Sequence, residues 1–472
     1  NLTMVYGAGQ GDFKSTGLSH LGHRGLVGRI IAGHFGGSPL LSRFVADNSI
    51  QGYNLPQGVL CQMFRDIAAK KPRTITHVGL GTFVDPRNDG GKLNSLSTED
   101  MVELVEFDGK EFLAYKTFPI DVAVLRGTSA DEKGNVSLEK EALTLETQAQ
   151  AMAAHAGGGK VIVQVERIVE EGSLHPREVK IPGVMVDAVV VANPDYHWQT
   201  WIEQYNPAYS GEIRVPMKTI PPLDLNIRKV IARRAAMELQ EDIVVNLGIG
   251  MAEGIANVAN EEGMLDSLTL TAEPGVIGGM PVAGLSFGAS VNAEAIIDQP
   301  SQFDFYHGGG LDVAFLGLAQ VDEGGNLNVS RFGPKLQGTG GFIDISQNAR
   351  KVVFLGTFTV GGLEIEVSDG SLSIVNEGRN KKFIKAVEQI TFSGKQAIST
   401  SQPIFYVTER CVFQLKKEGM TLIEIAPGVD LEKDILAQME FEPVVPDNIP
   451  LMDKRIFEPE PMGLIQLLRE KR

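Results

Sequence analysis

The apolar positions of this chain follow two periods. Short runs of β-branched and other apolar residues end at glycines, as in THVGLGTF (76–83), VVNLGIGM (244–251) and GTGGFIDI (338–345). Between such runs, apolar residues recur at helical spacing in 227–239 and 253–263. Strands that alternate with helices and are joined by glycine turns predict an α/β fold with mainly parallel sheets. Ligands of such sheets bind at the carboxyl ends of the strands, where these glycines lie.

A repeated pattern divides the chain into two related parts. DVAVLRGTSADEKGNVSLE begins at Asp121, and the similar DVAFLGLAQVDEGGNLNVS begins 191 positions later, at Asp312. The same offset pairs further positions without gaps: Asp131 with Asp322, Gly134 with Gly325, Asn135 with Asn326, and Lys160 with Lys351. Since only two copies occur, the pattern predicts two homologous open α/β domains and not a solenoid.

The boundary between these domains is predicted in the proline-rich stretch YNPAYSGEIRVPMKTIPPLDLN (205–226). A polar, proline-rich segment followed by a new amphipathic helix pattern is typical of a domain junction. We therefore predict a first domain over 1–210, a linker over 211–224 and a second domain over 225–472. The length of 472 residues fits more than one hydrophobic core.

The composition, 43% hydrophobic and 22% charged, is that of an ordinary globular protein. No apolar run approaches the roughly 20 residues that span a bilayer, so no membrane segment is expected. The formal net charge of −16 argues against a nucleic-acid partner, because phosphate backbones need a basic surface. A phosphorylated small molecule is compatible with this charge, since backbone N–H groups and a few cations can hold it.

The two cysteines, Cys61 and Cys411, are far apart and form no CxxC motif, which excludes a disulfide framework and a zinc site of ordinary spacing. Both lie in apolar segments, so we favour buried structural thiols over nucleophiles. A reducing compartment suits such a protein, and we expect a cytoplasmic location. The chain opens at NLTMVYGAG, inside a predicted strand, so its start gives no targeting information.

Two further motifs carry little chemical information. VVNLGIGMAEG has glycines at GxGxxxG spacing, one residue longer than the dinucleotide fingerprint. An anion-binding turn and a plain strand–helix turn fit this motif equally well. His20, His23 and His307 have no second ligand at metal-binding spacing, so we interpret them as structural or loop residues and predict no metal site.

One carboxylate has an unusual setting, in LTAEPGVIGGMP (270–281). SLTLTA before it is a buried-strand pattern, and Pro274–Gly275 ends that strand abruptly. Glu273 is then expected at the carboxyl end of a parallel strand, facing the ligand cleft. A solvated turn acid is the alternative, because glutamate is among the commonest exposed residues. The position makes Glu273 a candidate nucleophile or base.

Five segments together point to a known family: LTAEPGVIGG, SQFDFYHGGGLDVAFLGLAQVDEGGNLNVSRF, GTGGFIDIS, YNLPQGV and VGLGTFVDPR. They resemble class I coenzyme A transferases, in particular the fused, single-chain acetate or short-chain acyl CoA-transferases near the propionate and 3-ketoacid enzymes. The resemblance covers essentially the whole chain. It implies two related α/β domains in a homodimer or homotetramer, with acyl-CoA and short-chain carboxylic acids as partners. Family members usually carry a further strand and helix ahead of this region, which we expect the first domain to lack.

The resemblance also implies a reaction. In this family the glutamate of an E-x-G motif, here Glu273-Pro274-Gly275, attacks the acyl-CoA thioester. An acyl–glutamyl anhydride and then a glutamyl–CoA thioester form, and a second acid reverses these steps. No metal or redox cofactor takes part, and CoA is a co-substrate held covalently in the intermediate. The residue after the glutamate is often asparagine in ketoacid transferases and is proline here, which leaves the acid specificity open.

Further site residues follow from the same resemblance. Gln57 matches a glutamine that serves the glutamyl oxygen, and the backbone N–H groups of Gly340 and Gly341 match the oxyanion site for the substrate. A turn amide bonded to its own backbone is the alternative for Gln57. An acyl-CoA hydrolase on the same scaffold and a non-catalytic nucleotide-binding protein are the rival functions. The residues expected to contact CoA are Gly308, Gly309, Gly310, Asn326, Lys335 and Gly338.

Overall fold

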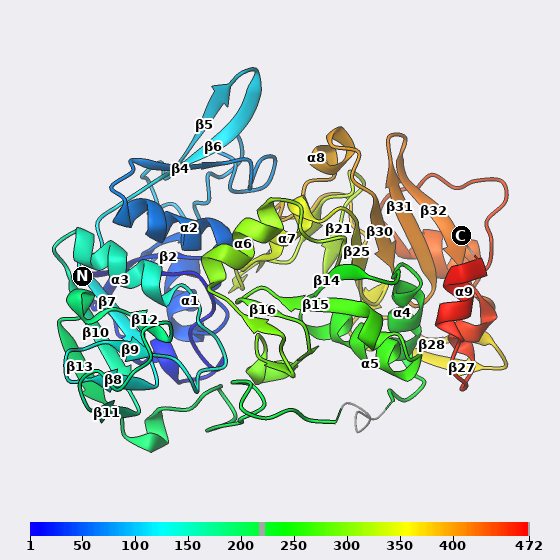
Figure 1. The fold of residues 1–472 in the computed structure, drawn as a ribbon. Coiled ribbons are helices and arrows are strands. Elements are labelled where there is room, and N and C mark those ends of the chain that lie inside the picture. Colours follow the sequence, from blue (N-terminus) through cyan, green and yellow to red (C-terminus); the bar gives the residue numbers. More distant parts are fainter. Residues whose placement is uncertain (217–221, 471–472) are drawn as a thin grey trace.

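The computed structural model describes residues 1–216 and 222–470 and contains two α/β halves (Figure 1). The first half, coloured blue to green-cyan, and the second, coloured green to red, lie side by side. The predicted linker includes 217–221, which lie outside the described residues. The predicted fold class is confirmed, because both halves have mainly parallel sheets with helices packed on them.

The second half is built on one nine-stranded sheet with the order β19-β16-β15-β14-β20-β25-β30-β31-β32. Its five central strands run parallel, and the strands at both edges are antiparallel. The central strands are strongly apolar because the sheet is covered on both faces. The bounds are β14 (Ile243–Leu247), β15 (Leu268–Ala272), β16 (Val276–Ile277), β19 (Ala295–Ile296), β20 (Val313–Gly317), β25 (Val352–Leu355), β30 (Ile404–Val407), β31 (Cys411–Lys416) and β32 (Gly419–Ile425).

Helices cover both faces of this sheet. α4 (Ile227–Ala236) and α5 (Gly254–Glu261) pack on one face, and α6 (Gln299–His307) and α7 (Phe342–Asn348) pack on the other. Alternate residues of β20 belong to the two cores, as the two-residue period of a strand requires. None of the helices within residues 1–216 and 222–470 is long and apolar enough to cross a membrane. Two further helices are α8 (Gly394–Ser399) and α9 (Leu464–Glu470).

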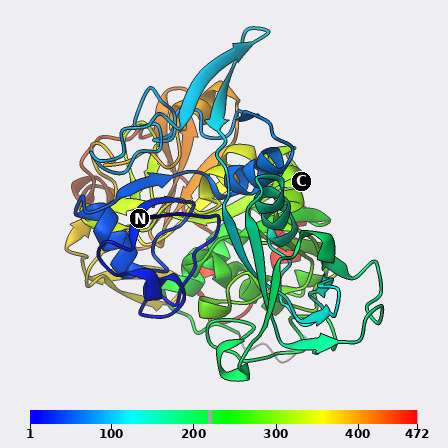
Figure 2. The same ribbon diagram turned by 90° about the vertical axis from the view of Figure 1, so that its left-hand side faces the viewer.

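The first half has two parallel three-stranded sheets, β1-β2-β3 and β13-β10-β7. A third sheet, β4-β6-β5, is antiparallel, and its β5–β6 hairpin projects from the molecule (Figures 1 and 2). The strand bounds are β1 (Leu2–Tyr6), β2 (Val27–Ala32), β3 (Gln51–Asn54), β4 (Arg73–Thr76), β5 (Val102–Phe107), β6 (Lys110–Lys116), β7 (Val122–Arg126), β10 (Lys160–Val165) and β13 (Ala188–Val191). The helices are α1 (Pro39–Ala46), α2 (Gln57–Ala68) and α3 (Thr147–Ala156).

The strands of the two halves correspond at two fixed offsets. At the 191-residue offset of the sequence repeat, β7 coincides end to end with β20. At an offset of 241, β1 and β2 correspond to β14 and β15, since Leu2 matches Ile243 and Val27 matches Leu268. The first half has 50 more residues between these pairs of strands, and its β4-β6-β5 sheet lies in that stretch. In this alignment Ala32, the last residue of β2, matches Glu273 of the second half.

The repeated turns have the same hydrogen bonds. Asn135 donates from its backbone N–H and its side-chain amide to the Asp131 carboxylate, both at 2.9 Å. Asn326 does the same to Asp322, at 3.0 and 3.1 Å. In each turn the asparagine Oδ1 then accepts a backbone N–H from a distant segment. The repeat that the sequence predicted is therefore also a repeat of local structure.

The two halves differ in what covers one face of these strands. Val313 and Phe315 are buried beneath α4 in the second half. Their counterparts in the first half, Val122 and Val124, are 52% and 76% exposed. Among the residues that the structure describes, no helix of the first half takes the place of α4. The duplication is preserved in strands and turns and not in this covering layer.

Replacing Asp322 by alanine removes the acceptor of four hydrogen bonds, from the N–H groups of Gly324, Asn326 and Val387 and from the Asn326 amide. We expect stability to fall by about 1–3 kcal/mol, because these donors are left without a partner. Asp131→Ala should have a similar effect on the first half. Calorimetric melting of both variants, with the exposed Asp447→Ala as control, measures this; unchanged melting temperatures would contradict the equivalence of the turns.

Candidate active site

Glu273 directly follows the buried strand β15, as predicted. Pro274 cannot extend the strand, and Gly275 turns the chain with a φ of +120°. A side chain on Gly275 would lie 2.1 Å from the Ile297 carbonyl oxygen, so this turn requires glycine. The Glu273 side chain is partly exposed and stands at the carboxyl end of a parallel strand.

The glycine loop GTGGF of the second half is bound by the backbone of the first half. The Gly340 N–H donates to the Gly33 carbonyl at 2.8 Å, and the Gly340 carbonyl accepts from the Gln57 N–H at 3.0 Å. The Thr339 N–H donates to Asn54 Oδ1 at 3.0 Å. The site therefore lies between the two halves, as the proximity of Gln57 and Glu273 requires.

Gly341 brings the start of α7 against the Glu273 carboxylate. A side chain on Gly341 would lie 2.2 Å from Glu273 Oε2, so only glycine fits beside the carboxylate. The Gly341 N–H makes no hydrogen bond within the described residues, whereas the Gly340 N–H is used by Gly33. Of the two donors predicted for the oxyanion site, Gly341 is the one whose N–H is available to a ligand in this structure.

Gln57 is the first residue of α2 and is 2% exposed. Its Nε2 is buried and has no hydrogen-bond partner among the residues described. The amide is nevertheless close enough to Glu273 to oppose the rise in the pKa of that carboxyl. The Gln57 amide thus faces the carboxylate without a full hydrogen bond. It is not a turn amide bonded to its own backbone, which was the alternative.

The Glu273 carboxyl has a strongly shifted pKa. Burial raises it from 4.5 to about 7, the negative charge of Asp344 adds to the rise, and Gln57 opposes it. A carboxyl that titrates near neutrality is a stronger nucleophile than an ordinary glutamate when ionised, and it still ionises at cellular pH. The electrostatics of the site therefore suit covalent catalysis.

The sequence did not identify Asp344 or the role of His307. Asp344 is fully buried in α7, accepts from the Gly58 N–H at 3.1 Å, and lies 2.9 Å from His307 Nε2. His307 is thus a structural histidine, and it lies against the site through its contact with Asp344. The only signal in the sequence was that Asp344 falls within the GTGGFIDIS segment.

The three glycines expected to contact CoA end helix α6. The N–H groups of Gly308, Gly309 and Gly310 donate to the carbonyls of Asp304, Tyr306 and Phe305, respectively, at 2.9–3.0 Å. Gly309 has a φ of +81°, the left-handed conformation typical of a helix C-terminus. These glycines have a local role, and their contact with CoA stays a prediction.

The other predicted CoA contacts differ in their surroundings. Asn326 uses its amide in the turn with Asp322 and in accepting the Gly394 N–H. Lys335 is exposed in a short hairpin. Gly338 has a φ of +82° and lies close to the first half. A side chain on Gly338 would lie 2.8 Å from the Gly33 carbonyl oxygen. Lys335 is the member of this set that is free to reach an anionic group of CoA.

Both cysteines are buried, as predicted. Burial and the charges of Glu146, Asp344 and Glu273 raise the pKa of Cys61 well above its usual range, so this thiol stays protonated at neutral pH. Burial likewise raises the pKa of Cys411. Neither thiol is suited to act as a nucleophile.

A GxSxG pattern, GLSFG at 284–288, is also excluded as a nucleophile site by its surroundings. Ser286 ends a short 3-10 helix instead of standing at a strand–helix turn. Its hydroxyl is buried and contacts the Glu203 carboxylate and the Thr200 hydroxyl. No histidine is among these contacts, so the arrangement lacks the base that a serine nucleophile needs.

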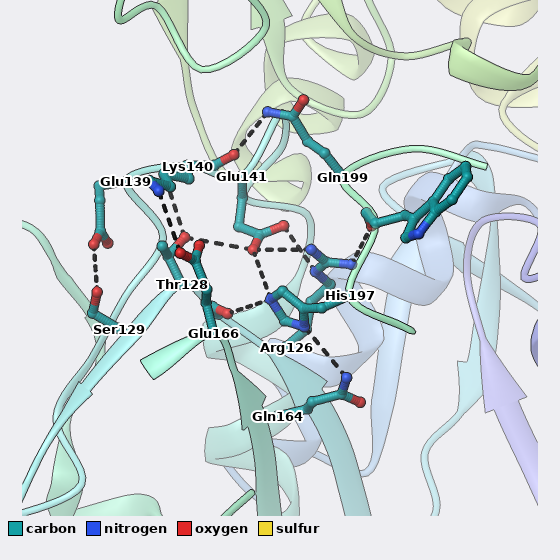
Figure 3. A network of polar contacts seen from close by, with 12 residues as sticks. Arg126, Thr128, Ser129, Glu139, Lys140, Glu141, Gln164, Glu166, His197 and Gln199 are labelled. Atoms are coloured by element: carbon teal, nitrogen blue, oxygen red, sulfur yellow. Dashed lines mark hydrogen bonds and ion pairs between the residues drawn. The ribbon is translucent and has the colours of Figure 1, made fainter. Parts of the chain in front are cut away.

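At the ends of β7 and β10 in the first half, polar side chains contact one another (Figure 3). Arg126 Nε, at the end of β7, lies 2.8 Å from Glu141 Oε2. His197 Nε2 lies 3.7 Å from Glu141 Oε1, and Gln164 contacts the other ring nitrogen. This cluster lies away from Glu273, since the strand end that matches Glu273 is that of β2.

Comparison with known proteins shows the family to which the chain belongs. A family model described as Coenzyme A transferase matches residues 1–192. Over 98% of its length the chain is 51% identical to the caffeate CoA-transferase of Acetobacterium woodii, of which it covers 90%, and 48% identical to the acetate CoA-transferase YdiF of Escherichia coli K12, of which it covers 87%. The solved structure of the acyl-CoA transferase YdiF of E. coli O157:H7, a thioester complex with CoA, shares 47% identity and a TM-score of 0.92 over 98% of this chain and 88% of that one.

The chain therefore belongs to the coenzyme A transferase family. It is a CoA-transferase, and the resemblance inferred from its motifs is confirmed.

Gly341→Ala should abolish most activity while leaving the fold intact. The added methyl group has to displace Glu273 Oε2 from a distance of 2.2 Å, and a displacement of about 1 Å at a reacting group can cost ~100-fold in rate. Steady-state transfer assays with melting curves measure both effects. Gly157→Ala, whose added methyl group would have its nearest neighbour at 3.4 Å, is the control and should keep full activity. A Gly341→Ala enzyme with normal activity would contradict this geometry.

Glu146→Gln should stabilise the protein at high pH only. Burial raises the pKa of Glu146 from 4.5 to about 6, so the stability that its protonated form contributes is complete below about pH 4.5 and is lost as the pH rises through about 6. The glutamine variant avoids this loss, which is on the order of 2 kcal/mol at pH 8. Melting temperatures at pH 5 and pH 8 measure the difference. The exposed Glu132→Gln is the control, and an equal effect at both pH values would contradict the assignment.

Proposed function

We infer that this CoA-transferase moves CoA between a short-chain acyl-CoA and a free carboxylic acid such as acetate, with Glu273 as the covalent nucleophile. The observation that carries the proposal is the position of Glu273. Its carboxyl stands at a strand end, contacts Gly341 and faces the Gln57 amide, and burial raises its pKa to about 7. A carboxylate so placed has a donor on either side for the charges that acyl transfer creates.

The first step forms an anhydride. The Glu273 carboxylate attacks the thioester carbonyl, the new C–O bond forms, and the C–S bond breaks with its electron pair leaving on the CoA thiolate. Negative charge develops on the substrate carbonyl oxygen, to which the Gly341 N–H can donate. The absence of a side chain on Gly341 leaves room for the thioester.

The second step transfers CoA to the protein. The thiolate attacks the Glu273 carbonyl carbon, a C–S bond forms, and the substrate acid leaves as a carboxylate. Charge now develops on the Glu273 oxygen, and the buried Gln57 Nε2, which has no other partner in the described part of the chain, can donate to it. A second acid repeats both steps in reverse and leaves as the new acyl-CoA. The thioester energy is retained throughout, so no external energy source is needed.

Two relatives support parts of this proposal. The similar E. coli structure is a thioester complex with CoA, which supports a CoA thioester on this protein. The similar enzymes named for acetate and for caffeate act on acids of very different size. Acetate is our choice for this chain because its motifs resemble the short-chain enzymes. A caffeate-sized acid is the first alternative to test.

Mass spectrometry can detect the covalent intermediate directly. After mixing with acetyl-CoA and no acceptor acid, borohydride should reduce a glutamyl thioester, and the modification should map to the peptide that contains Glu273. Glu273→Gln should show no modification, and Glu273→Asp should transfer about 100-fold more slowly because its carboxyl is shorter by about 1 Å. Turnover without modification, or modification at Cys61, would contradict the mechanism.

The same mixture with propionate added separates transfer from hydrolysis. Propionyl-CoA should accumulate at the rate at which acetyl-CoA disappears. Free CoA as the main product would instead support an acyl-CoA hydrolase on this scaffold. A parallel assay with a cinnamate-type acid tests whether the acid site is restricted to short chains.

A further inference from the structure

Asp344 is a buried carboxylate that the steps above do not use. It lies in the first turn of α7, has no exposed surface, and follows Gly341 by three residues. Its Oδ2 accepts from the Gly58 N–H at 3.1 Å, and its Oδ1 lies 2.9 Å from His307 Nε2. A buried carboxylate is costly unless donors satisfy it, and here each oxygen has one.

The contacts of His307 determine which ring nitrogen carries the hydrogen. Its Nδ1 lies 3.0 Å from Gln62 Nε2, and the same amide atom lies 2.8 Å from Asp304 Oδ1. Because a carboxylate only accepts, the Gln62 atom is the NH₂ group, and Nδ1 of His307 is an acceptor. Nε2 of a neutral ring therefore carries the hydrogen and donates to Asp344.

Asp344 also holds the helix turn that carries Gln57. Gln57 and Gly58 are the first two residues of α2, and their N–H groups donate to the Gly340 carbonyl and to Asp344. A side chain on Gly58 would lie 2.6 Å from Asp344 Oδ1, so this approach requires glycine. The partial positive charge of the α2 N-terminus further favours a carboxylate at this place.

Asp344 supplies the negative charge that acts on the nucleophile. It adds to burial in raising the pKa of Glu273. The other titratable groups close by are Cys61 from α2, Tyr115 from β6 and Tyr306 from α6. All three stay uncharged at neutral pH, because burial raises the pKa values of Cys61 and Tyr115 well above their usual ranges and that of Tyr306 to about 12. The charge of Glu146, the residue before α3, contributes to the raised pKa of Cys61.

We propose that Asp344 is a positioning residue for acyl transfer and that His307 is its supporting partner. The inference rests on Glu273 being the covalent nucleophile. Asp344 fixes the turn of Gln57 beside Glu273, and its charge destabilises the free Glu273 carboxylate. When Glu273 becomes an anhydride or a thioester it loses its charge, and the repulsion ends. The covalent states are thereby favoured relative to the free enzyme.

Asp344→Asn tests this proposal. The variant keeps the shape but removes the charge, and one amide oxygen cannot accept from both Gly58 and His307. The measured quantity is the rate of acetate release from acetyl-CoA without an acceptor, which reports formation of the glutamyl–CoA thioester, between about pH 5.5 and 8.5. In the wild type this rate rises with pH as Glu273 ionises. In Asp344→Asn the rise should move to lower pH, and the plateau should fall about tenfold, less than the ~100-fold expected for a displaced nucleophile. The KM for acetyl-CoA should stay within twofold, because Asp344 is buried.

Asp66→Asn is the matched control. Asp66 lies on α2, the helix that carries Gln57 and Gly58, and its carboxylate contacts Lys71 and Thr74, both at 2.7 Å. Its loss should leave the pH profile and the plateau unchanged. An Asp344→Asn profile identical to that of the wild type, or an equal shift in Asp66→Asn, would overturn the proposal. Failure of the wild type to release acetate at all would instead contradict the covalent mechanism.

A pair of variants at His307 tests the supporting role without altering Asp344. His307→Gln can still donate to Asp344 and should retain the wild-type profile. His307→Leu removes the donor that holds Asp344 Oδ1 in place, so the Asp344 carboxylate is no longer fixed near Glu273, and the profile should shift to lower pH as in Asp344→Asn. Equal profiles for the two variants would refute the role of His307. Melting curves of all variants restrict the comparison to folded enzyme.

Discussion

The candidate active site depends on one contact between the two halves, that of the Gly340 peptide with the backbone of the first half. Its N–H donates to Gly33 and its carbonyl accepts from Gln57, so a loop of the second half is fixed by two backbone hydrogen bonds of the first. This contact sets Gly341 beside Glu273 and the Gln57 amide opposite it. The donors are in place before substrate arrives, and no reorganisation is needed when charge develops.

The burial of a second carboxylate near Glu273 follows from the same contact. Because α2 starts at the loop, its Gly58 N–H meets Asp344, and a second carboxylate is buried near the nucleophile. Two carboxylates with different numbers of donors acquire different roles in one site. Asp344 has a hydrogen-bond donor at each of its oxygens. Glu273 lies beside Gly341 at the start of α7 and faces the Gln57 amide without a full hydrogen bond. The less satisfied carboxylate is the one with access to solvent and substrate.

The sequence predicted those features that depend on local pattern. The strand before Glu273 and the glycine turn after it could be located, because strand ends and tight turns have short-range signals. The repeat gave two α/β halves. The Asp344–Gly58 contact joins residues 286 positions apart, and no spacing rule reports such a pair. Gly308–Gly310, whose contact with CoA stays a prediction, end α6, and the sequence pattern does not separate a helix end from a ligand loop. Gln57 was found by family resemblance alone.

The correspondence of β2 with β15 has a consequence for how many sites a chain can have. Ala32 ends β2 where the matching position of the second half is Glu273, and the next carbonyl, that of Gly33, accepts the Gly340 N–H. In the proposed mechanism, one copy of the duplicated strand end supplies the reacting group, and the other anchors the loop that serves it. Because Ala32 has no reactive side chain, the matching strand end of the first half offers no second covalent acceptor. The two halves of the proposed site are then specialised partners, not two catalysts in tandem.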